Sequence, residues 1–375
     1  MFPEKLHKKL NQRVDSESLR NLAEQSSLID FSSNDYLGYS KSKIIFDDTH
    51  NYLVNENHTQ NGATGSRLLS GNHKLYTYVE LKLKEIHQSE ALVFNSGYDA
   101  NLGFFSAVPQ RHDVILYDEY SHASIRDGIR LSSAKAYAFK HNNINDLEEK
   151  LRKYSGNDDV YVVTESVFSM DGDSPNLSEL CSLCEKYDAK SVIDEAHALG
   201  VFDYGLVQKL GLENDVFARI VTFGKAMGCH GAAILGCKNL KEYLINFSRS
   251  FIYTTGLSPH SLATIQMVYE YFEKDALKSK NLHENIQYFK SKCAEFQLDY
   301  LFIDSVSAIQ CCVISGNSNV KNCANFIQSN GFNVKPILSP TVPGGQERLR
   351  FCIHSYNTFE QIDEVLNLLS TFVNK

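Results

Sequence analysis

Two short apolar segments of the chain are each followed by a side chain capable of covalent or acid–base chemistry. Lys225 follows RIVTF (219–223) after one glycine, in the string TFGKAMG, where the flanking glycines let backbone approach a ligand closely. Asp194 ends the segment SVID (191–194), and His197 follows three residues later. A lysine amine forms carbon–nitrogen double bonds with aldehydes, and a carboxylate beside a nitrogen base favours the protonated base. This combination suggests covalent chemistry on a bound aldehyde.

These are requirements of a pyridoxal phosphate site, which needs a lysine for the Schiff base and an acidic partner for the pyridine nitrogen. The phosphate needs hydroxyl groups and backbone N–H groups at a helix N-terminus, and the ring needs a flat side chain against it. Residues of suitable type at the ends of apolar segments are Lys225, Asp194, Ser169, Thr222, Gly97, Tyr98 and His122.

Each of these residues also has an ordinary structural interpretation. A lysine after a strand is commonly a solvated side chain, and His122 in YSHASIRDG could cap a helix or lie on the surface. Asp194 and His197 could cap the helix that follows them. The residues therefore support a pyridoxal phosphate site as a set and not one by one.

Two rival nucleotide sites lack their required motifs. The string DEAH (194–197) is the magnesium-binding signature of one group of helicases, which also needs G-x-x-x-x-G-K-[ST] to hold phosphates. In this chain Lys225 is followed by Ala226, and Arg219 stands where the first glycine should be. No G-x-G-x-x-G follows a strand, so a dinucleotide fold has no support either.

Short apolar segments alternate with longer periodic ones from residue 91 onward. This alternation predicts an α/β fold with a mostly parallel seven-stranded sheet and helices on both faces. Ligands bind such sheets beyond the carboxyl ends of the strands, where the residues above are expected. The predicted strands span 91–95, 114–117, 134–139, 160–164, 191–194, 219–223 and 232–236, with helices at 74–88 and 143–154.

The remainder of the chain predicts a smaller α+β unit. A long helical stretch over about 258–297 is expected to link the two parts. The predicted organisation is an N-terminal arm at 1–40, a large domain at 41–275 and a small C-terminal domain at 276–375. Within the small domain we expect strands at 310–315 and 348–354, a helix at 319–330 and a final helix from about 358.

Composition narrows the class of protein further. The 375 residues carry a net charge of −8, which gives no bulk attraction to nucleic acid or to an anionic membrane. No run of eighteen apolar residues and no secretory signal occurs, so we expect a cytoplasmic protein. The nine scattered cysteines suggest reduced thiols. Cys181 and Cys184 form a C-x-x-C, which we interpret as two apolar residues on one helix face. Without a second C-x-x-C, no metal site is predicted.

Ordered motifs along nearly the whole chain resemble those of the α-oxoamine synthases, a group of fold-type-I pyridoxal phosphate enzymes. These enzymes join an amino acid to an acyl thioester with loss of CO2. The matching strings are FSSNDYLG (31–38), GATGSRLLSGNH (62–73), FNSGYDAN (94–101), SHAS (121–124), TESVFSMDGDSPNL (164–177), IDEAHALG (193–200), TFGKAMGCHGAAI (222–234), IYTTGLSP (252–259) and PTVPGGQERLR (340–350).

The resemblance implies a role for each matched residue. Lys225 corresponds to the Schiff-base lysine, Asp194 to the partner of the pyridine nitrogen, and His197 to the partner of the ring hydroxyl. His122 corresponds to the residue stacked on the ring. The resemblance further implies that the protein is a homodimer with its site at the interface. Other implied contacts are Gly97, Tyr98, Ser169 and Thr222 to the cofactor, Thr254 and Thr255 to the neighbouring subunit's phosphate, Asn34 and Arg350 to the amino-acid carboxylate, and Arg20 and Thr341 to the acyl substrate.

Within the family, SRLLSGNH (66–73), DSVSAIQ (304–310) and PTVPGGQERLR (340–350) are most similar to members that use L-alanine with a pimeloyl thioester, on CoA or a carrier protein. Siblings that use glycine or serine with another acyl-CoA are the alternative. A non-catalytic protein that binds the cofactor is a third possibility, against which the intact Lys225, Asp194 and His197 argue. Tyr98 replaces a common phenylalanine, and Cys229 and His230 have no assigned role.

Overall fold

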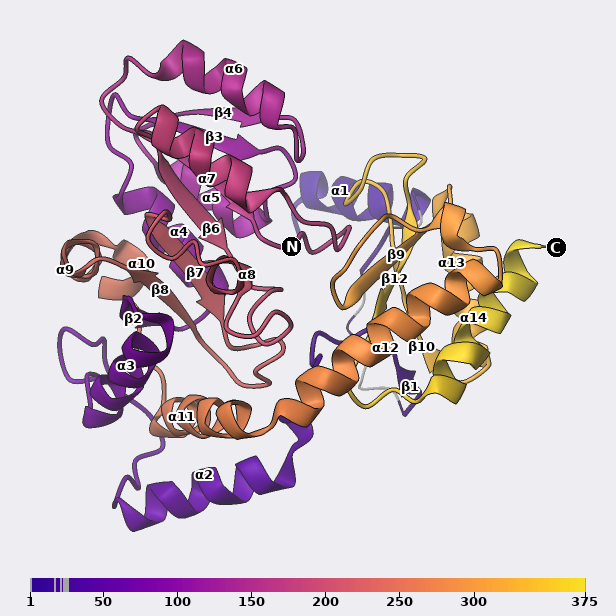
Figure 1. Cartoon of the computed structure of the whole chain (residues 1–375), viewed down its shortest axis with the longest axis horizontal. Coiled ribbons are helices and arrows are strands. Elements are labelled where there is room, and N and C mark those ends of the chain that lie inside the picture. The colour runs from indigo at the N-terminus through magenta and orange to yellow at the C-terminus, as the bar shows by residue number, and fades with distance from the viewer. Residues whose placement is uncertain (1, 17, 21, 23–26, 375) are drawn as a thin grey trace. The chain divides into compact units, whose positions relative to one another are not determined.

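The computed structural model describes residues 2–16, 18–20, 22 and 27–374 (Figure 1). The chain divides into two compact units. The larger unit comprises residues 34–169 and 174–280, and the smaller comprises 1–33, 170–173 and 281–375.

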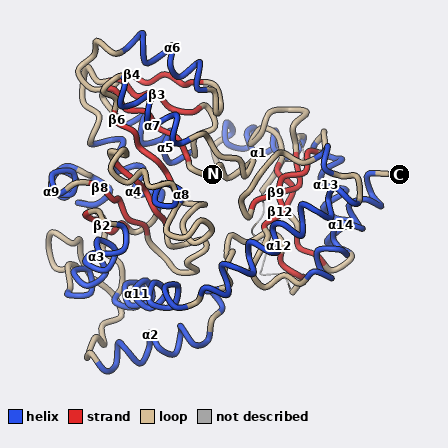
Figure 2. The backbone as a smooth tube through the Cα atoms, in the orientation of Figure 1, coloured by secondary structure: helices blue, strands red, loops and turns tan. Residues whose placement is uncertain are grey.

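A seven-stranded sheet forms the centre of the larger unit, as predicted (Figure 2). β8 runs antiparallel to both of its neighbours, β2 and β7, and the other pairs are parallel. In spatial order the strands are β2 (Glu90–Phe94), β8 (Ala232–Gly236), β7 (Ala218–Thr222), β6 (Lys190–Asp194), β5 (Val160–Glu165), β3 (Val114–Asp118) and β4 (Lys135–Phe139).

Helices cover both faces of this sheet because its strands are apolar on both sides. One apolar core includes Phe104 and Ile125 from the helices on the first face, and the other includes Leu147 and Leu180 from the second. The first face carries α4 (Gly97–Ala107), α5 (Ala123–Leu131), α9 (Lys238–Phe247) and α10 (Arg249–Ile252). The second carries α6 (Ile144–Tyr154), α7 (Leu177–Lys186) and α8 (Leu206–Lys209).

Cys181 and Cys184 both lie buried on α7 and are free thiols, which confirms their interpretation as apolar residues of one helix face. Burial raises the pKa of the Cys181 thiol to about 11, so this group is not a thiolate at neutral pH.

A layer of three longer helices, α2 (Lys43–Asn55), α3 (Lys74–His87) and α11 (Pro259–Lys274), packs together in the same unit. The prediction of one helical stretch over 258–297 is wrong in one respect, because the helix breaks at Asp275 and α12 (Ala276–Glu295) begins after it. Asp275 has non-helical dihedrals, and its carboxylate accepts the Lys278 N–H at 3.4 Å. Aspartate competes with helical backbone for such bonds and therefore favours helix ends.

The smaller unit is built on an antiparallel sheet with two helices packed together beside it. Its strand order is β11 (Lys335–Ile337), β12 (Arg348–Cys352) and β9 (Ile309–Val313), and β1 (Ile29–Asp30) pairs in parallel with β10 (Phe332–Asn333). The helices are α13 (Asn317–Ser329) and α14 (Phe359–Val373), with α1 (Glu4–Asp15) near the N-terminus. The predicted α+β composition is confirmed.

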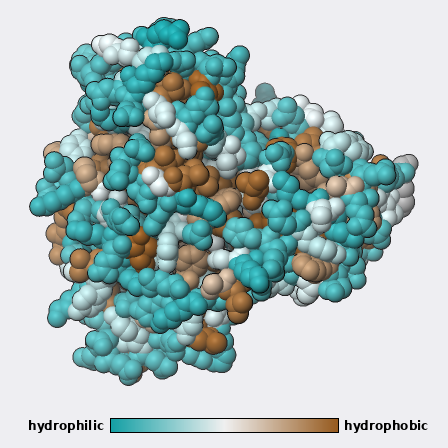
Figure 3. Space-filling view, viewed as in Figure 1, coloured by the Kyte–Doolittle hydropathy of each residue, from teal (hydrophilic) through white to brown (hydrophobic). Residues whose placement is uncertain are grey.

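Among the residues that the structure describes, no helix is long and apolar enough to span a membrane. Hydrophilic residues cover most of the face drawn in Figure 3, with hydrophobic residues visible between them.

Candidate functional site

Three neighbouring strands of the large sheet end in polar side chains. β5 ends at Glu165, β6 at Asp194 and β7 at Thr222. Glu165 and Asp194 are direct partners in the parallel ladder, so their carboxyl groups leave the sheet side by side. The carboxyl ends of parallel strands are where α/β sheets bind ligands, and the candidate site lies there.

Asp194 is held at both carboxylate oxygens. It is 5% exposed, and its Oδ1 accepts the Ala196 N–H at 2.9 Å. Its Oδ2 accepts the side-chain amide of Asn101 at 2.7 Å. A buried carboxylate with two donors is fixed in orientation, as a partner for a cationic ring nitrogen must be.

Lys225 lies half-buried in a tight loop after β7. The Lys225 carbonyl accepts the Gly228 N–H at 2.8 Å, and Cys229 N–H donates to the Phe223 carbonyl at 2.9 Å. Gly228 has a φ of +62°, and a Cβ there would overlap the backbone nitrogen of Ser40. The loop that carries Lys225 therefore requires glycine at this position.

His122 is the N-cap of α5 and is exposed in the single chain. Its backbone N–H donates to Glu165 Oε1 at 2.7 Å, and its Nδ1 accepts the Ser124 backbone N–H at 3.2 Å. Surrounding protein lowers the pKa of its imidazole, and the nearby charge of Lys225 lowers it further, whereas Asp194 raises it. The ring thus favours its neutral form, in which it can lie against a cationic aromatic ring without repulsion.

Glu165 is a buried acid beside Asp194. Burial and, second, the neighbouring Asp194 carboxylate raise its pKa to about 8, against the opposing charge of Lys225. Two adjacent carboxyl groups in a desolvated site do not both ionise readily. We therefore assign a proton to Glu165 at neutral pH.

His197 lies close to the loop between β1 and α2. It is 4% exposed, and its Nδ1 lies 2.8 Å from the hydroxyl of Tyr36. The Tyr36 hydroxyl also donates to Asn34 Oδ1 at 3.1 Å. The structure thus joins two predicted site residues, His197 and Asn34, through a third residue between them.

The start of α4 forms the other end of the site. Gly97 is its first residue, Ser96 caps it, and a Cβ on Gly97 would lie 3.6 Å from Thr222. The helix N-terminus therefore faces the end of β7, and the backbone N–H groups of a first helical turn are suited to a phosphate. The Tyr98 hydroxyl donates to Asp127 Oδ2 at 2.5 Å, and this bond raises the pKa of Tyr98.

The remaining predicted residues of the larger unit lie in nearby loops. Ser169 is half-buried in the turn after β5. Asn95 lies just before α4, and its side-chain amide donates to Thr254 Oγ1 at 3.2 Å and to the Thr255 carbonyl at 2.7 Å. The segment with the two threonines is thereby tied to the segment that leads into α4.

Three predicted substrate residues belong to the smaller unit. Arg350 lies on β12, is 8% exposed, and its Nη1 donates to Cys352 Sγ at 2.9 Å. Thr341 is exposed in the loop before β12, and its N–H donates to the Leu338 carbonyl at 2.9 Å. Arg20 is exposed in a segment without regular structure. Their roles toward a substrate stay predictions.

Sequence reasoning assigned no role to Asn101, Glu165 or Tyr36, although each lies inside a matched motif. Asn101 is buried and contacts Asp194, and Glu165 contacts the backbone of His122. Asn101 stands four residues after Gly97, one turn along α4, which was a usable signal because residues at this spacing share a helix face. Glu165 and Tyr36 gave no comparable signal.

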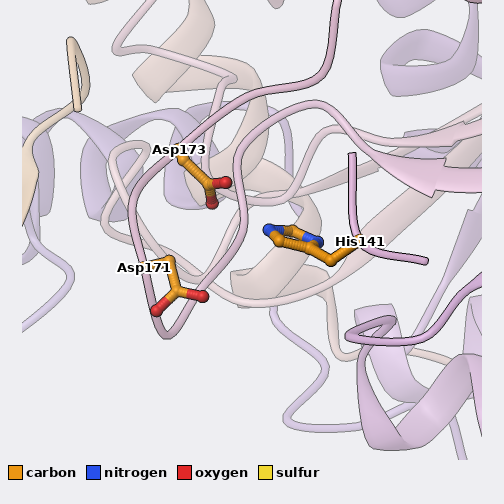
Figure 4. Close-up of side chains that lie close together, drawn as sticks. All are labelled: His141, Asp171 and Asp173. Atoms are coloured by element: carbon orange, nitrogen blue, oxygen red, sulfur yellow. The ribbon is translucent and has the colours of Figure 1, made fainter. Parts of the chain in front are cut away.

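Figure 4 shows three side chains of metal-binding type, His141 of the larger unit and Asp171 and Asp173 of the smaller. Within its own unit, His141 Nδ1 lies 2.9 Å from Asp118 Oδ1. Within the smaller unit, Asp171 is ion-paired with Arg348. We assign no metal to these residues.

The donor set of the larger unit fits pyridoxal phosphate. A buried, oriented carboxylate is present at Asp194, an amine at Lys225 and a flat ring at His122. At Gly97, where a side chain would approach Thr222, the missing Cβ leaves space beside a helix N-terminus. These groups match the needs of the ring nitrogen, the aldehyde, the ring face and the phosphate.

Comparisons with known proteins agree with this fit. The family model described as "Aminotransferase class I and II" matches residues 26–369. An enzyme of Emericella nidulans named 8-amino-7-oxononanoate synthase is 36% identical over 93% of this chain and 90% of its own length.

Solved structures agree as well. The structure of 8-amino-7-oxononanoate synthase from Francisella tularensis has a TM-score of 0.79 at 28% identity, over 93% of this chain and 99% of that one. Serine palmitoyltransferase of Sphingomonas wittichii has a TM-score of 0.90 at 25% identity, over 99% and 97% of the two chains. The chain therefore belongs to the class I and II aminotransferase family, as a pyridoxal-phosphate-dependent α-oxoamine synthase.

Proposed function

We propose that this protein condenses L-alanine with a pimeloyl thioester, on CoA or a carrier protein, to give 8-amino-7-oxononanoate, CO2 and the free thiol. This is a step of biotin synthesis, and we place it in the cytoplasm. The observation that carries the choice of substrates is the 36% identity, over 93% of the chain, to an enzyme of that name.

The bound cofactor supplies an electron sink that stabilises negative charge on the α-carbon of the amino acid. The chain's own task is to hold that sink in its cationic form. The carboxylate of Asp194, oriented by two N–H donors, would do so at the ring nitrogen. The neutral imidazole of His122 would lie against the ring face, and His197 would bind the ring hydroxyl.

Lys225 would hold the cofactor through its amine and, as a free amine, would take the α-proton of the amino acid. Its half-buried amine lies in a loop constrained by Gly228, which holds it near the end of β7. The α-carbon then bonds to the thioester carbonyl carbon as the carbon–sulfur bond breaks and the thiol leaves. The substrate carboxylate departs as CO2, and a proton returns to the α-carbon to give the aminoketone. Placing two substrates against one carbon is the main contribution of the protein.

Substrate recognition is assigned to four residues on the basis of the family resemblance. Asn34 and Arg350 hold the amino-acid carboxylate, for which the guanidinium fork of arginine is suited. Arg20 and Thr341 contact the acyl substrate. The protein works as a homodimer in which Thr254 and Thr255 reach the phosphate bound by the partner subunit.

Serine with a long-chain acyl-CoA is the second candidate. It is favoured by the TM-score of 0.90 to serine palmitoyltransferase, which exceeds the 0.79 to the 8-amino-7-oxononanoate synthase structure. Sequence identity favours the first proposal, since it is 28% to the 8-amino-7-oxononanoate synthase structure and 25% to serine palmitoyltransferase. Side-chain identity reports the substrate pocket more directly than backbone similarity does.

The test is to incubate the purified holoprotein with pimeloyl-CoA and, separately, L-alanine, glycine and L-serine, and to detect the aminoketone by mass. Palmitoyl-CoA with L-serine forms the parallel arm. Product with alanine and pimeloyl-CoA alone is expected. Product only in the palmitoyl arm would replace the proposal by the second candidate. Absence of α-proton exchange with every amino acid would indicate a non-catalytic protein.

A further inference from the structure

One side chain bridges the two groups that were assigned to the cofactor ring. Asn101 lies on α4, is 2% exposed, and its Nδ2 donates both to Asp194 Oδ2 at 2.7 Å and to Ser124 Oγ at 3.0 Å. Ser124 Oγ in turn lies 2.7 Å from His122 Nδ1. A hydrogen-bond chain thus connects the carboxylate of Asp194 to the imidazole of His122.

The orientation of the Asn101 amide follows from its surroundings. Reversing the amide would place Oδ1 2.7 Å from the carboxylate oxygen of Asp194, which puts two acceptors in contact. In the present orientation Oδ1 has no hydrogen-bond partner among the described residues. The unpartnered carbonyl costs some stability, but the two hydrogen bonds made by Nδ2 outweigh this cost and determine the orientation of the amide.

The positions of the protons along this hydrogen-bond chain follow from the donors and acceptors. The Ser124 backbone N–H donates to His122 Nδ1 at 3.2 Å, and a backbone N–H cannot act as an acceptor. His122 Nδ1 therefore carries no proton and accepts from the Ser124 hydroxyl, whose oxygen accepts from Asn101. The imidazole is then neutral, with its proton on Nε2.

Close packing of α4 against α5 makes this chain possible. A Cβ on Gly128 of α5 would lie 2.9 Å from the Asn101 carbonyl oxygen and 2.9 Å from Phe105 Cβ. Glycine therefore lets the helices approach closely enough for Asn101 to reach Ser124.

Building on the proposed function, we infer that Asn101 is a positioning residue that sets two cofactor contacts at once. Through one hydrogen it fixes the Asp194 carboxylate, and through the other it directs the Ser124 hydroxyl proton to His122. A neutral His122 imidazole would not repel a cationic pyridine ring, whereas a protonated imidazolium would repel it. The charges that act on His122 are Asp194 and Asp127, which favour its protonation, and Lys225, which opposes it. The neighbouring Glu165 accepts the His122 backbone N–H.

The test uses two variants and a matched control. Asn101→Ala removes both bonds, and Ser124→Ala removes only the branch to His122. Asn246→Ala removes an exposed helical asparagine whose amide donates to the Glu242 carbonyl. Because the chain contains no tryptophan, pyridoxal phosphate binding is measured by equilibrium dialysis with visible absorbance. The His122 ring is followed by 15N NMR, with its signal assigned by its loss in His122→Asn.

For Asn101→Ala we expect the dissociation constant of the cofactor to rise on the order of tenfold or more, as for loss of a hydrogen bond to a charged group. The His122 titration midpoint should rise as well. Ser124→Ala should raise that midpoint with a smaller effect on cofactor binding, and Asn246→Ala should change neither.

Wild-type cofactor affinity in a folded Asn101→Ala protein would overturn the inference. If Asn101→Ala does not fold, Ser124→Ala decides, and an unchanged His122 titration there would overturn the inference. A proton on Nδ1 of wild-type His122 would do the same. No readout uses a substrate, so failure of the alanine and pimeloyl-CoA reaction leaves the inference standing.

Discussion

Replacing Glu165 with glutamine should remove a loss of stability that the wild-type protein suffers as pH rises. Glu165 is 3% exposed, and burial followed by the charge of Asp194 raises its pKa from 4.5 to about 8. The folded chain therefore binds this proton more tightly than the unfolded chain does. Linkage requires the resulting stability to be fully present below pH 4.5 and to disappear as pH rises through about 8.

The size of the effect follows from the displaced pKa. At about 1.4 kcal/mol per pKa unit, the difference between the folded and unfolded pKa of Glu165 corresponds to a loss of roughly 5 kcal/mol in the free energy of unfolding once pH exceeds the folded pKa. For a chain of 375 residues this is about 6 °C in Tm, if the whole chain unfolds together. Glutamine keeps the oxygen that accepts the His122 N–H at 2.7 Å and carries no titrating proton.

The assay is differential scanning fluorimetry of the cofactor-free protein from pH 5 to pH 9. The Tm of Glu165→Gln minus that of wild type should grow with pH over this range. Glu85→Gln, an exposed change of the same chemistry on α3, provides the control and should follow wild type. A Tm difference for Glu165→Gln that stays constant across the range would refute a protonated Glu165.

Three further substitutions test other parts of the site. Lys225→Ala should abolish turnover with the fold retained, and borohydride should then attach no cofactor to the protein. Turnover at the wild-type rate would show that Lys225 is not the Schiff-base lysine. Tyr36→Phe removes the hydroxyl that lies 2.8 Å from His197 Nδ1. The free energy of unfolding in urea should fall by about 1 kcal/mol, and kcat should fall in a separate activity assay. An unchanged kcat would argue against His197 as a contact of the cofactor ring. Gly228→Ala should lower the free energy of unfolding by about 1–3 kcal/mol, because Gly228 has a φ of +62° and an added Cβ would overlap backbone. Gly62 has open space around it, so Gly62→Ala should be nearly neutral in thermal unfolding. Equal effects of the two substitutions would contradict a strained loop at Gly228.

Local sequence determined the elements of this protein and the residue types at the candidate site. All seven strands of the large sheet were predictable because each is a short apolar run bounded by turn residues. Asp194 and Lys225 could be singled out because one ends such a run and the other lies just after one, where a parallel sheet places its ligands. The break at Asp275 was missed because helical periodicity continues on both sides of it.

Tertiary structure alone decided which groups act on one another. The bond between Asn101 and Asp194 joins residues 93 positions apart, and its existence depends on how α4 packs against the sheet. The raised pKa of Glu165 arises from burial and from a neighbouring strand, neither of which local sequence encodes. The proton on His122 is likewise set by Ser124 and Asn101 acting together. Hydrophobic periodicity specifies elements, but charge states depend on desolvation and distance, which exist only once the elements have packed.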